Sequence, residues 1–216
     1  THPGMVDHCR HVNGLFNAAV EDALKITDRW IGMLMDAVRD AGIEETTSFA
    51  IVSDHGHMEW VRVAAPNVLF RQKGLIQVDA DEKITDWQLL CEESGLSCQV
   101  HVKDPAREDE FYRWLRELAD TGLYGFNEVL TRAECESRYG LSGSFSFALE
   151  GDGYTTFSSD WTGKLITPMK DVGCGAHHSS HGHMPEKGPQ PPMVLAGPAF
   201  KSGVTVERES ILDEAP

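Results

Sequence analysis

The apolar positions near the start of the chain recur with the period of a helix. From 14 to 41 they form one helical stripe, and Gly42 follows as a stop signal. The stripe comprises Phe16, Val20, Leu24, Ile31, Leu34 and Val38, with Ala19, Ala23 and Trp30 beside it. A continuous apolar run at 48–52 then predicts a short strand buried on both faces, as in parallel sheets. A helix, a short loop and a buried strand in this order indicate the α/β class.

The middle of the chain has a different pattern. Residues 97–104 are typical of a strand, and Asp104-Pro105 supplies an N-cap and a first-turn proline for a helix. The apolar face of that helix carries Phe111, Leu115 and Leu118.

A second helix start follows at Thr131, where Glu134 completes a capping box, and Gly140 should end the helix. Residues 144–150 then alternate between apolar and polar, which predicts a strand of a half-exposed sheet.

The last part of the chain, from 171 onward, is rich in Gly, His, Ser and Pro, which is typical of loops, and residues 192–200 should return as a core strand. We therefore expect an α/β core segment over 1–65, an inserted α+β cap over 66–175 and a return to the core over 176–216.

The charge balance limits the partners of such a protein. Acidic residues number 34 against 19 basic ones, for a net charge of −15, which opposes binding to a nucleic-acid polymer or an anionic membrane. A small phosphorylated substrate is compatible with this charge, because bound divalent cations reverse its sign locally. No apolar run approaches the roughly 20 residues of a membrane helix, and the opening residues lack the pattern of a secretory signal.

The cysteines do not form a recognisable framework. There are five, at irregular spacing and without a C-x-x-C pair: Cys9, Cys91, Cys98, Cys135 and Cys174. A disulfide scaffold is therefore not expected, which favours a reducing compartment without fixing the localisation.

The ten histidines, in contrast, fall into clusters. The three groups are His2, His8 and His11; His55 and His57; and His177, His178, His181 and His183. Only His101 stands apart. Because each group has a carboxylate nearby or within reach, we expect the three groups to be parts of one site.

Three motifs could supply metal ligands. Asp54-His55 ends the predicted strand, where ligands bind in open α/β sheets, and Asp with His suits zinc, iron or manganese. Asp7 and His11 have a spacing that places both on one face of a helix, and His181 lies in a loop. Each motif alone also has a plainer interpretation: helix caps for the two aspartates, packing or surface positions for the first two histidines, and an unstructured metal-binding tract around His181.

In this order, the motifs resemble the C-terminal half of the alkaline phosphatase superfamily, and most closely its type I phosphodiesterase/nucleotide pyrophosphatase family. The resemblance extends over nearly the whole chain and includes "SDHG" at 53–56 and "AGPAFKSGV" at 196–204. It implies an α/β fold with an alkaline-phosphatase-like sheet sandwiched by helices, whose N-terminal strands are missing here, and a small inserted α+β cap.

The resemblance also implies two divalent metal ions, with zinc expected and manganese or iron as alternatives. Asp7, His11 and His181 would hold one ion. Asp54 and His55 would hold the other, together with a further Asp and a Thr or Ser nucleophile. In that family these last two groups lie upstream, and nothing in this sequence matches them, so we expect a fragment that is inactive alone.

The implied activity is hydrolysis of phosphodiester or nucleotide pyrophosphate bonds through a covalent intermediate on the nucleophile, with a nucleotide-like substrate. A phosphonoacetate-type hydrolase, a phosphomonoesterase, a phosphosugar mutase, a sulfatase or a non-catalytic metal-binding domain are the alternatives. A stand-alone small fold with an unrelated zinc site is another.

Two groups of residues beside the motifs have less certain roles. His57 and His183 are adjacent to expected ligands, where they could orient a ligand, but we expect both to be exposed. The cap aromatics Tyr154, Phe157 and Trp161 could stack on a base, although packing is the simpler expectation.

Overall fold

The computed structural model describes residues 1–173, 177–207 and 210, so Cys174 and parts of the predicted 176–216 segment lie outside the described residues. The chain begins with two helices, α1 (Met5–Asn13) and α2 (Ala18–Asp40). The Asn17 side chain caps α2 by accepting from the backbone N–H groups of Ala19 and Val20. Among the described residues, no helix combines the length and apolarity that crossing a bilayer requires.

The predicted helix at 14–41 is thus confirmed, but most of its apolar stripe is not buried. Within α2 only Val20 and Ala23 are buried, and Leu24, Trp30 and Leu34 are exposed. The stripe therefore packs against little of the described chain.

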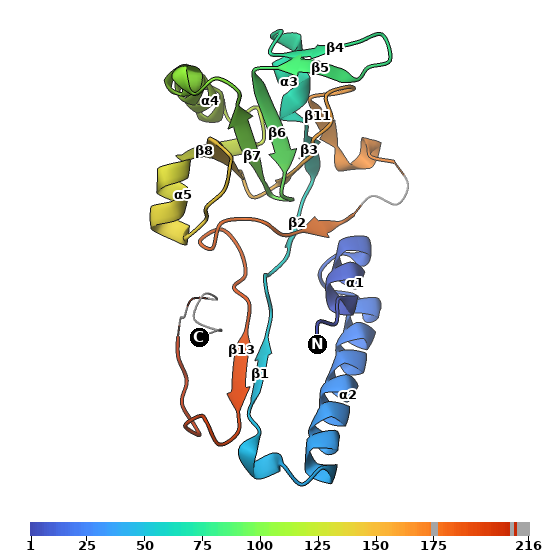
Figure 1. The fold of residues 1–216 in the computed structure, drawn as a ribbon. Coiled ribbons are helices and arrows are strands. Elements are labelled where there is room, and N and C mark those ends of the chain that lie inside the picture. The colour runs from blue at the N-terminus through green and yellow to red at the C-terminus, as the bar shows by residue number, and fades with distance from the viewer. Residues whose placement is uncertain (174–176, 208–209, 211–216) are drawn as a thin grey trace.

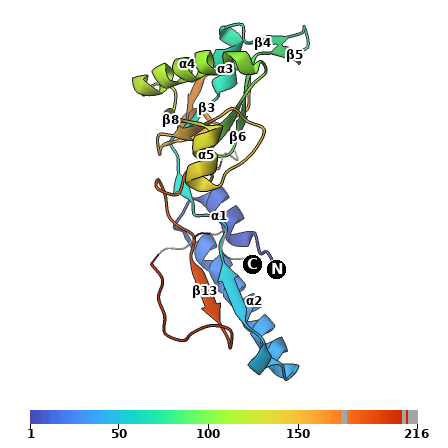
Figure 2. The same cartoon turned by 60° about the vertical axis from the view of Figure 1, so that its left-hand side comes forward.

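The predicted strands at 48–52 and 192–200 form β1 (Phe49–Val52) and β13 (Met193–Ala196), which run alongside α2 (Figures 1 and 2). They pair with each other antiparallel, with Phe49 opposite Ala196 and Val52 opposite Met193. The expectation of a strand buried on both faces, as in a parallel sheet, was wrong for β1, and the expectation of a core strand was wrong for β13. Among the described residues the two form a two-stranded antiparallel sheet, in which three residues of β1 and all of β13 are exposed.

The upper unit, elements β3 to β11 (residues 62–168), contains most of the buried core (Figure 1). Its main sheet is four-stranded and antiparallel, in the order β6-β7-β9-β8. The core packs Leu115 of α4 against this sheet, with Phe70, Leu89, Val100 and Leu149 around it.

The remaining bounds complete the upper unit. Its helices are α3 (Pro66–Gln72), α4 (Glu108–Thr121) and α5 (Arg132–Tyr139), and it contains the short 3-10 helix η2 (Pro105–Arg107). Two further 3-10 helices lie outside this unit: η1 (Glu44–Thr46) and η3 (Met169–Asp171). Its strands are β3 (Arg62–Ala64), β4 (Ile76–Val78), β5 (Ile84–Trp87), β6 (Leu89–Glu93), β7 (Ser97–Val102), β8 (Phe126–Thr131), β9 (Phe147–Gly151), β10 (Thr155–Phe157) and β11 (Ile166–Pro168).

The helix starts predicted in this unit are confirmed. Asp104 accepts a hydrogen bond from the backbone of Ala106, and η2 leads into α4. Thr131 and Glu134 form a reciprocal capping box at α5, which ends at Gly140 with a left-handed backbone, φ 65°.

The strand predicted at 144–150 is present as β9, but the expectation of a half-exposed strand was wrong. All five residues of β9 are buried, because the strand is central and both faces of its sheet are covered. Phe147 and Leu149 face the main core, whereas Ala148 packs in a second cluster with Met184.

Glu150 of β9 is a fully buried carboxylate behind the loop that follows His181. Its Oε1 accepts a hydrogen bond from the Met184 backbone N–H at 2.9 Å, and Lys187 Nζ lies 4.0 Å away. Its Oε2 has no hydrogen-bond partner among the described residues. Burial raises the pKa of Glu150 to about 7, although the Met184 bond and Lys187 act in the opposite direction.

A short strand pair joins the upper unit to α1. β2 (Met58–Glu59) pairs antiparallel with β12 (Ser179–Ser180), with Ser180 opposite Met58. His57 directly precedes β2 and His181 directly follows β12, so both lie at the same end of this antiparallel pair.

Removing the buried Leu115 side chain tests the core of the upper unit. Leu115→Ala should lower the free energy of unfolding by about 2 to 5 kcal/mol, because it leaves a cavity at a fully buried position. Urea denaturation measures the change. Leu123→Ala is the matched control, since Leu123 is 67% exposed, and should change stability by less than about 0.5 kcal/mol. Equal effects of both substitutions would contradict this core.

The buried Glu150 carboxyl predicts a pH-dependent stability. Its pKa is higher in the folded chain than in the unfolded one, so its favourable contribution is full below about pH 4.5 and is lost as the pH rises to about 7. Glu150→Gln should remove this loss and gain up to about 3 kcal/mol over the wild type between pH 4.5 and pH 8. Urea denaturation across that range measures it. Glu117→Gln, at an exposed position of α4, should follow the wild-type profile, and a Glu150→Gln profile that also does so would refute the assignment.

Candidate metal site

Helix α1 presents Asp7 and His11 on one face, as their spacing predicts. Asp7 lies in its first turn and His11 in its last, and Asp7 Oδ1 is 3.4 Å from His11 Nε2. His11 Nδ1 lies 2.7 Å from the backbone oxygen of Ser179. Because a carbonyl oxygen only accepts, this contact places a proton on Nδ1, so a neutral His11 has its Nε2 lone pair toward Asp7.

Strand β12 brings His181 to the same carboxylate. His181 follows β12 directly, and its Nε2 lies 3.8 Å from Asp7 Oδ1. The next residue, Gly182, has φ +86°, and a Cβ there would lie 1.8 Å from the Ser94 carbonyl oxygen. Only glycine fits this close backbone approach, which explains the His-Gly pair of the motif.

His55 and Asp54 follow β1 and approach from the opposite direction. The His55 ring stacks on His181 with centroids 3.7 Å apart and planes inclined by 19°. Asp54 lies farther out, with Oδ2 3.6 Å from Nε2 of His55 and 3.6 Å from Nε2 of His2. The Asp54 carboxylate thus joins the cluster through His55.

Gly56 follows His55 and lies against protein backbone. A Cβ at Gly56 would lie 2.1 Å from the carbonyl oxygen of Pro189. The turn after β1 is therefore held against the proline-rich segment that leads into β13.

His57 is buried, contrary to its predicted exposure. We expected an exposed side chain, but His57 is only 3% exposed. Its Nε2 lies 2.8 Å from Asp7 Oδ1, and its Nδ1 lies 3.1 Å from Ser179 Oγ. Three imidazoles therefore lie beside the Asp7 carboxylate, those of His11, His57 and His181, and the fourth, His55, stacks on His181.

His183 is not exposed either, and its ring lies close to Gly188: a Cβ there would be 2.1 Å from His183 Nε2. Its Nδ1 is buried with no hydrogen-bond partner among the described residues. It therefore packs in the loop after β12.

The protonation of these groups suits cation binding. Burial, and then the neighbouring His55 and His11, lower the pKa of His181 to about 4. Burial also lowers the pKa of His57 despite its bond to Asp7. Burial acts to raise the pKa of Asp7, but the His57 hydrogen bond and the nearby imidazoles hold it below its usual value. At neutral pH the Asp7 carboxylate therefore lies beside the neutral imidazoles of His57 and His181, and ionised carboxylates and neutral imidazoles are the forms that bind metals.

Among the described residues, two compact sets have all their ligand atoms within 4.8 Å of one another: Asp7, His55 and His181, and Asp7, His11 and His57. The set implied by the resemblance, Asp7, His11 and His181, is not one of these two sets and takes one histidine from each. The rings of His11 and His181 have centroids 5.1 Å apart. Asp7 is thus the shared centre of the cluster.

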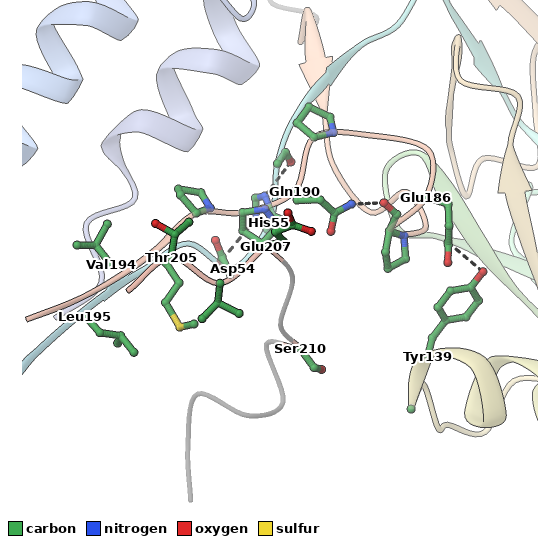
Figure 3. Close-up of a pocket in the computed structure, with 18 of the residues that line it drawn as sticks. Asp54, His55, Tyr139, Glu186, Gln190, Val194, Leu195, Thr205, Glu207 and Ser210 are labelled. Carbon is green, nitrogen blue, oxygen red and sulfur yellow. Dashed lines mark hydrogen bonds and ion pairs between the residues drawn. The ribbon is translucent and has the colours of Figure 1, made fainter. Parts of the chain in front are cut away.

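A cavity of about 1510 Å³ opens beside the cluster, between it and the upper unit. Asp54 and His55 lie on one side, and Tyr139 and Glu186, joined by a hydrogen bond of 3.2 Å, lie on the other (Figure 3). The cavity is also lined by Val194 of β13.

The cap aromatics considered from the sequence lie elsewhere. Tyr154, Phe157 and Trp161 are absent from the described lining of this cavity. Phe157 is buried in the core, Tyr154 is exposed, and the Trp161 indole donates to the carbonyl oxygen of Glu82. Tyr139, which the sequence analysis did not single out, is the aromatic side chain of α5 at the cavity.

The sequence matches the family described as type I phosphodiesterase/nucleotide pyrophosphatase over residues 2–182. Over 50 residues, 23% of this chain, it is 38% identical to mouse ectonucleotide pyrophosphatase/phosphodiesterase family member 1, of which the match covers 6%.

Solved structures with a similar fold carry the same family name. Murine ectonucleotide pyrophosphatase/phosphodiesterase 5 matches with a TM-score of 0.60 at 17% identity, over 90% of this chain and 46% of that one. An inactive threonine-to-alanine variant of the murine protein, in complex with AMP, gives the same TM-score and identity. The human protein matches with a TM-score of 0.58 at 18% identity. This chain thus spans about half the length of these structures.

At these identities the structural likeness shows the fold, and it confirms the mixed α/β class predicted from the sequence. The family match covers most of the chain. This chain therefore belongs to the type I phosphodiesterase/nucleotide pyrophosphatase family of the alkaline phosphatase superfamily.

Proposed function

We propose that this chain supplies the metal-binding C-terminal portion of a two-metal hydrolase that cleaves phosphodiester or nucleotide pyrophosphate bonds. The observation that carries the proposal is the cluster of imidazoles around the Asp7 carboxylate. Three segments distant in sequence contribute to it, and family membership gives the cluster a chemical context.

The first ion would be held by Asp7, His11 and His181. Ligand atoms of a tetrahedral zinc site lie about 3.3 Å apart, because each is about 2.0 to 2.1 Å from the ion. The Asp7 Oδ1 distances to His11 Nε2 and His181 Nε2, 3.4 and 3.8 Å, are close to that spacing. The fixed tautomer of His11 favours the same role, because its Nε2 lone pair faces the carboxylate.

The second ion would be held by Asp54 and His55, whose carboxylate and Nε2 are 3.6 Å apart. Manganese or iron could replace zinc with these oxygen and nitrogen donors. When bound, the two ions would neutralise phosphate oxygens and lower the pKa of a coordinated hydroxyl group or water. The residues of this chain would fix their positions.

The nucleophile, a Thr or Ser, and a further Asp would come from polypeptide outside these 216 residues. Two observations support this. The inactive murine relative carries a threonine-to-alanine substitution. In this chain, apolar side chains of α2, β1 and β13 are exposed, among them Met33, Val52 and Val194, and would pack well against further chain.

The substrate would be a small nucleotide-like phosphate ester. The murine relative binds AMP, and the cavity beside His55 and His181 has room for a ligand of this size. We propose that the segment 66–175 acts as a cap on this cavity, through α5 and Tyr139. The net charge of −15 disfavours a nucleic-acid polymer as the substrate.

Zinc titration of the purified chain, followed by calorimetry, tests the composite site. Asp7→Asn, His11→Gln and His181→Gln should each lower the affinity at least about 10-fold, since each removes a ligand to the same ion. Asp54→Asn should affect only a second, weaker binding step. The matched control is His101→Gln, because His101 lies in β7 of the upper unit. If substitutions in only one of the three segments lowered affinity, the composite site would be refuted.

Activity tests the assignment of the nucleophile. The 216-residue chain, saturated with zinc, should hydrolyse bis-p-nitrophenyl phosphate no faster than buffer containing zinc, because the covalent step needs a hydroxyl group that this chain does not provide. A longer polypeptide containing the preceding portion should hydrolyse it. Hydrolysis by the short chain that disappears in Asp7→Asn would place the nucleophile within these residues and contradict the proposal.

A further inference from the structure

His57 and Ser179 lie directly behind the expected ligands. We propose that they are positioning residues, which fix the Asp7 carboxylate and the His11 ring for the ion without binding it. This inference rests on the proposed metal site. Both side chains are buried, with His57 3% and Ser179 0% exposed, so water does not compete for their contacts.

The distance between His57 and Asp7 favours a hydrogen bond over shared ligation. His57 Nε2 and Asp7 Oδ1 are 2.8 Å apart, which is typical of a charge-assisted hydrogen bond. Two ligands of one tetrahedral ion would be about 3.3 Å apart. A proton between the two atoms also occupies the lone pair through which His57 Nε2 would bind an ion.

Ser179 contacts both imidazoles with different atoms. Its backbone oxygen accepts from His11 Nδ1 at 2.7 Å, and its Oγ lies 3.1 Å from His57 Nδ1. The same hydroxyl group lies 2.9 Å from the Arg10 carbonyl oxygen in α1. Ser179 thus ties α1, the turn after β1 and strand β12 together.

Counting donors and acceptors assigns opposite tautomers to the two rings. The ionised Asp7 accepts from His57 Nε2, so a neutral His57 has its lone pair on Nδ1. The Ser179 hydroxyl group has a single proton, and it can donate that proton to the Nδ1 lone pair only in place of its bond to the Arg10 carbonyl oxygen. His11 carries its proton on Nδ1 instead. The Asp7 carboxylate therefore faces one protonated Nε2, from His57, and one bare Nε2, from His11.

This arrangement gives each ring a separate task. His57 holds one side of the carboxylate by a hydrogen bond, and the remaining lone pairs of Asp7 stay directed toward His11 and His181. Partners of this kind, behind the ligands, orient metal sites, and their loss typically lowers metal affinity about 10- to 100-fold.

Cobalt binding to the purified chain tests the proposal, because Co²⁺ reports both affinity and coordination by its visible absorption. The two informative variants each keep one of the two hydrogen bonds of His57, either the bond to Asp7 or the bond to Ser179. In His57→Gln the amide nitrogen takes the place of Nε2 and can still donate to Asp7. In His57→Asn it takes the place of Nδ1 and reaches only Ser179. His57→Leu removes both contacts, and His101→Gln is the control.

The proposal predicts that His57→Gln keeps the affinity for Co²⁺ within about 3-fold, whereas His57→Asn and His57→Leu lose about 10- to 100-fold. Ser179→Ala removes one hydroxyl group and should lower the affinity for Co²⁺ about 3- to 10-fold. This variant should fold even if position 57 tolerates no substitution. Thermal melting checks the folding of each variant. The band positions and intensities at saturating Co²⁺ should stay those of the wild type.

Three results would overturn the proposal. Wild-type affinity in His57→Leu would show that the residue does not position the site. An altered spectrum in His57→Gln at saturation would show that His57 is itself a ligand. An absence of Co²⁺ binding by the wild-type chain would refute the metal site, and this inference with it, so the two failures are distinguishable.

Discussion

The pairing of β2 with β12 is the constraint on which the candidate site depends. These two short strands join parts of the chain that are far apart, since His57 and Ser179 are 122 residues from each other. Once they pair, His57, just before β2, and His181, just after β12, lie at the same end of the pair and contact the same carboxylate. Ser179 contacts α1 through its carbonyl and hydroxyl oxygens. No single segment could assemble this group of polar side chains.

The surroundings of the site differ on its two sides. Above it, the upper unit is well packed, with α4 and the four-stranded sheet enclosing the core. Below it, α2 and the β1–β13 pair expose apolar side chains to solvent. The site lies at the junction, and the cavity beside it is lined by residues from both sides, among them Tyr139 of α5 and Val194 of β13.

Local signals in the sequence predicted local structure well. The capping box at Thr131 and the spacing of Asp7 and His11 each act within one or two helical turns, so residues close in sequence determine the local structure. The burial of β1 could not be predicted in this way, because an apolar run is buried only where other chain covers it. His57 is the clearest case: its burial comes from α1 and Ser179, which are distant in sequence. A histidine two residues after a ligand motif was the available signal.

A crystal structure of the chain grown with zinc, with anomalous data collected at the zinc edge, tests the central claim most directly. The account predicts an anomalous peak about 2.0 to 2.2 Å from Asp7, His11 Nε2 and His181 Nε2, with His57 still hydrogen-bonded to Asp7 and outside coordination distance. A peak coordinated by His57, or zinc bound only at residues of a single segment, would contradict it.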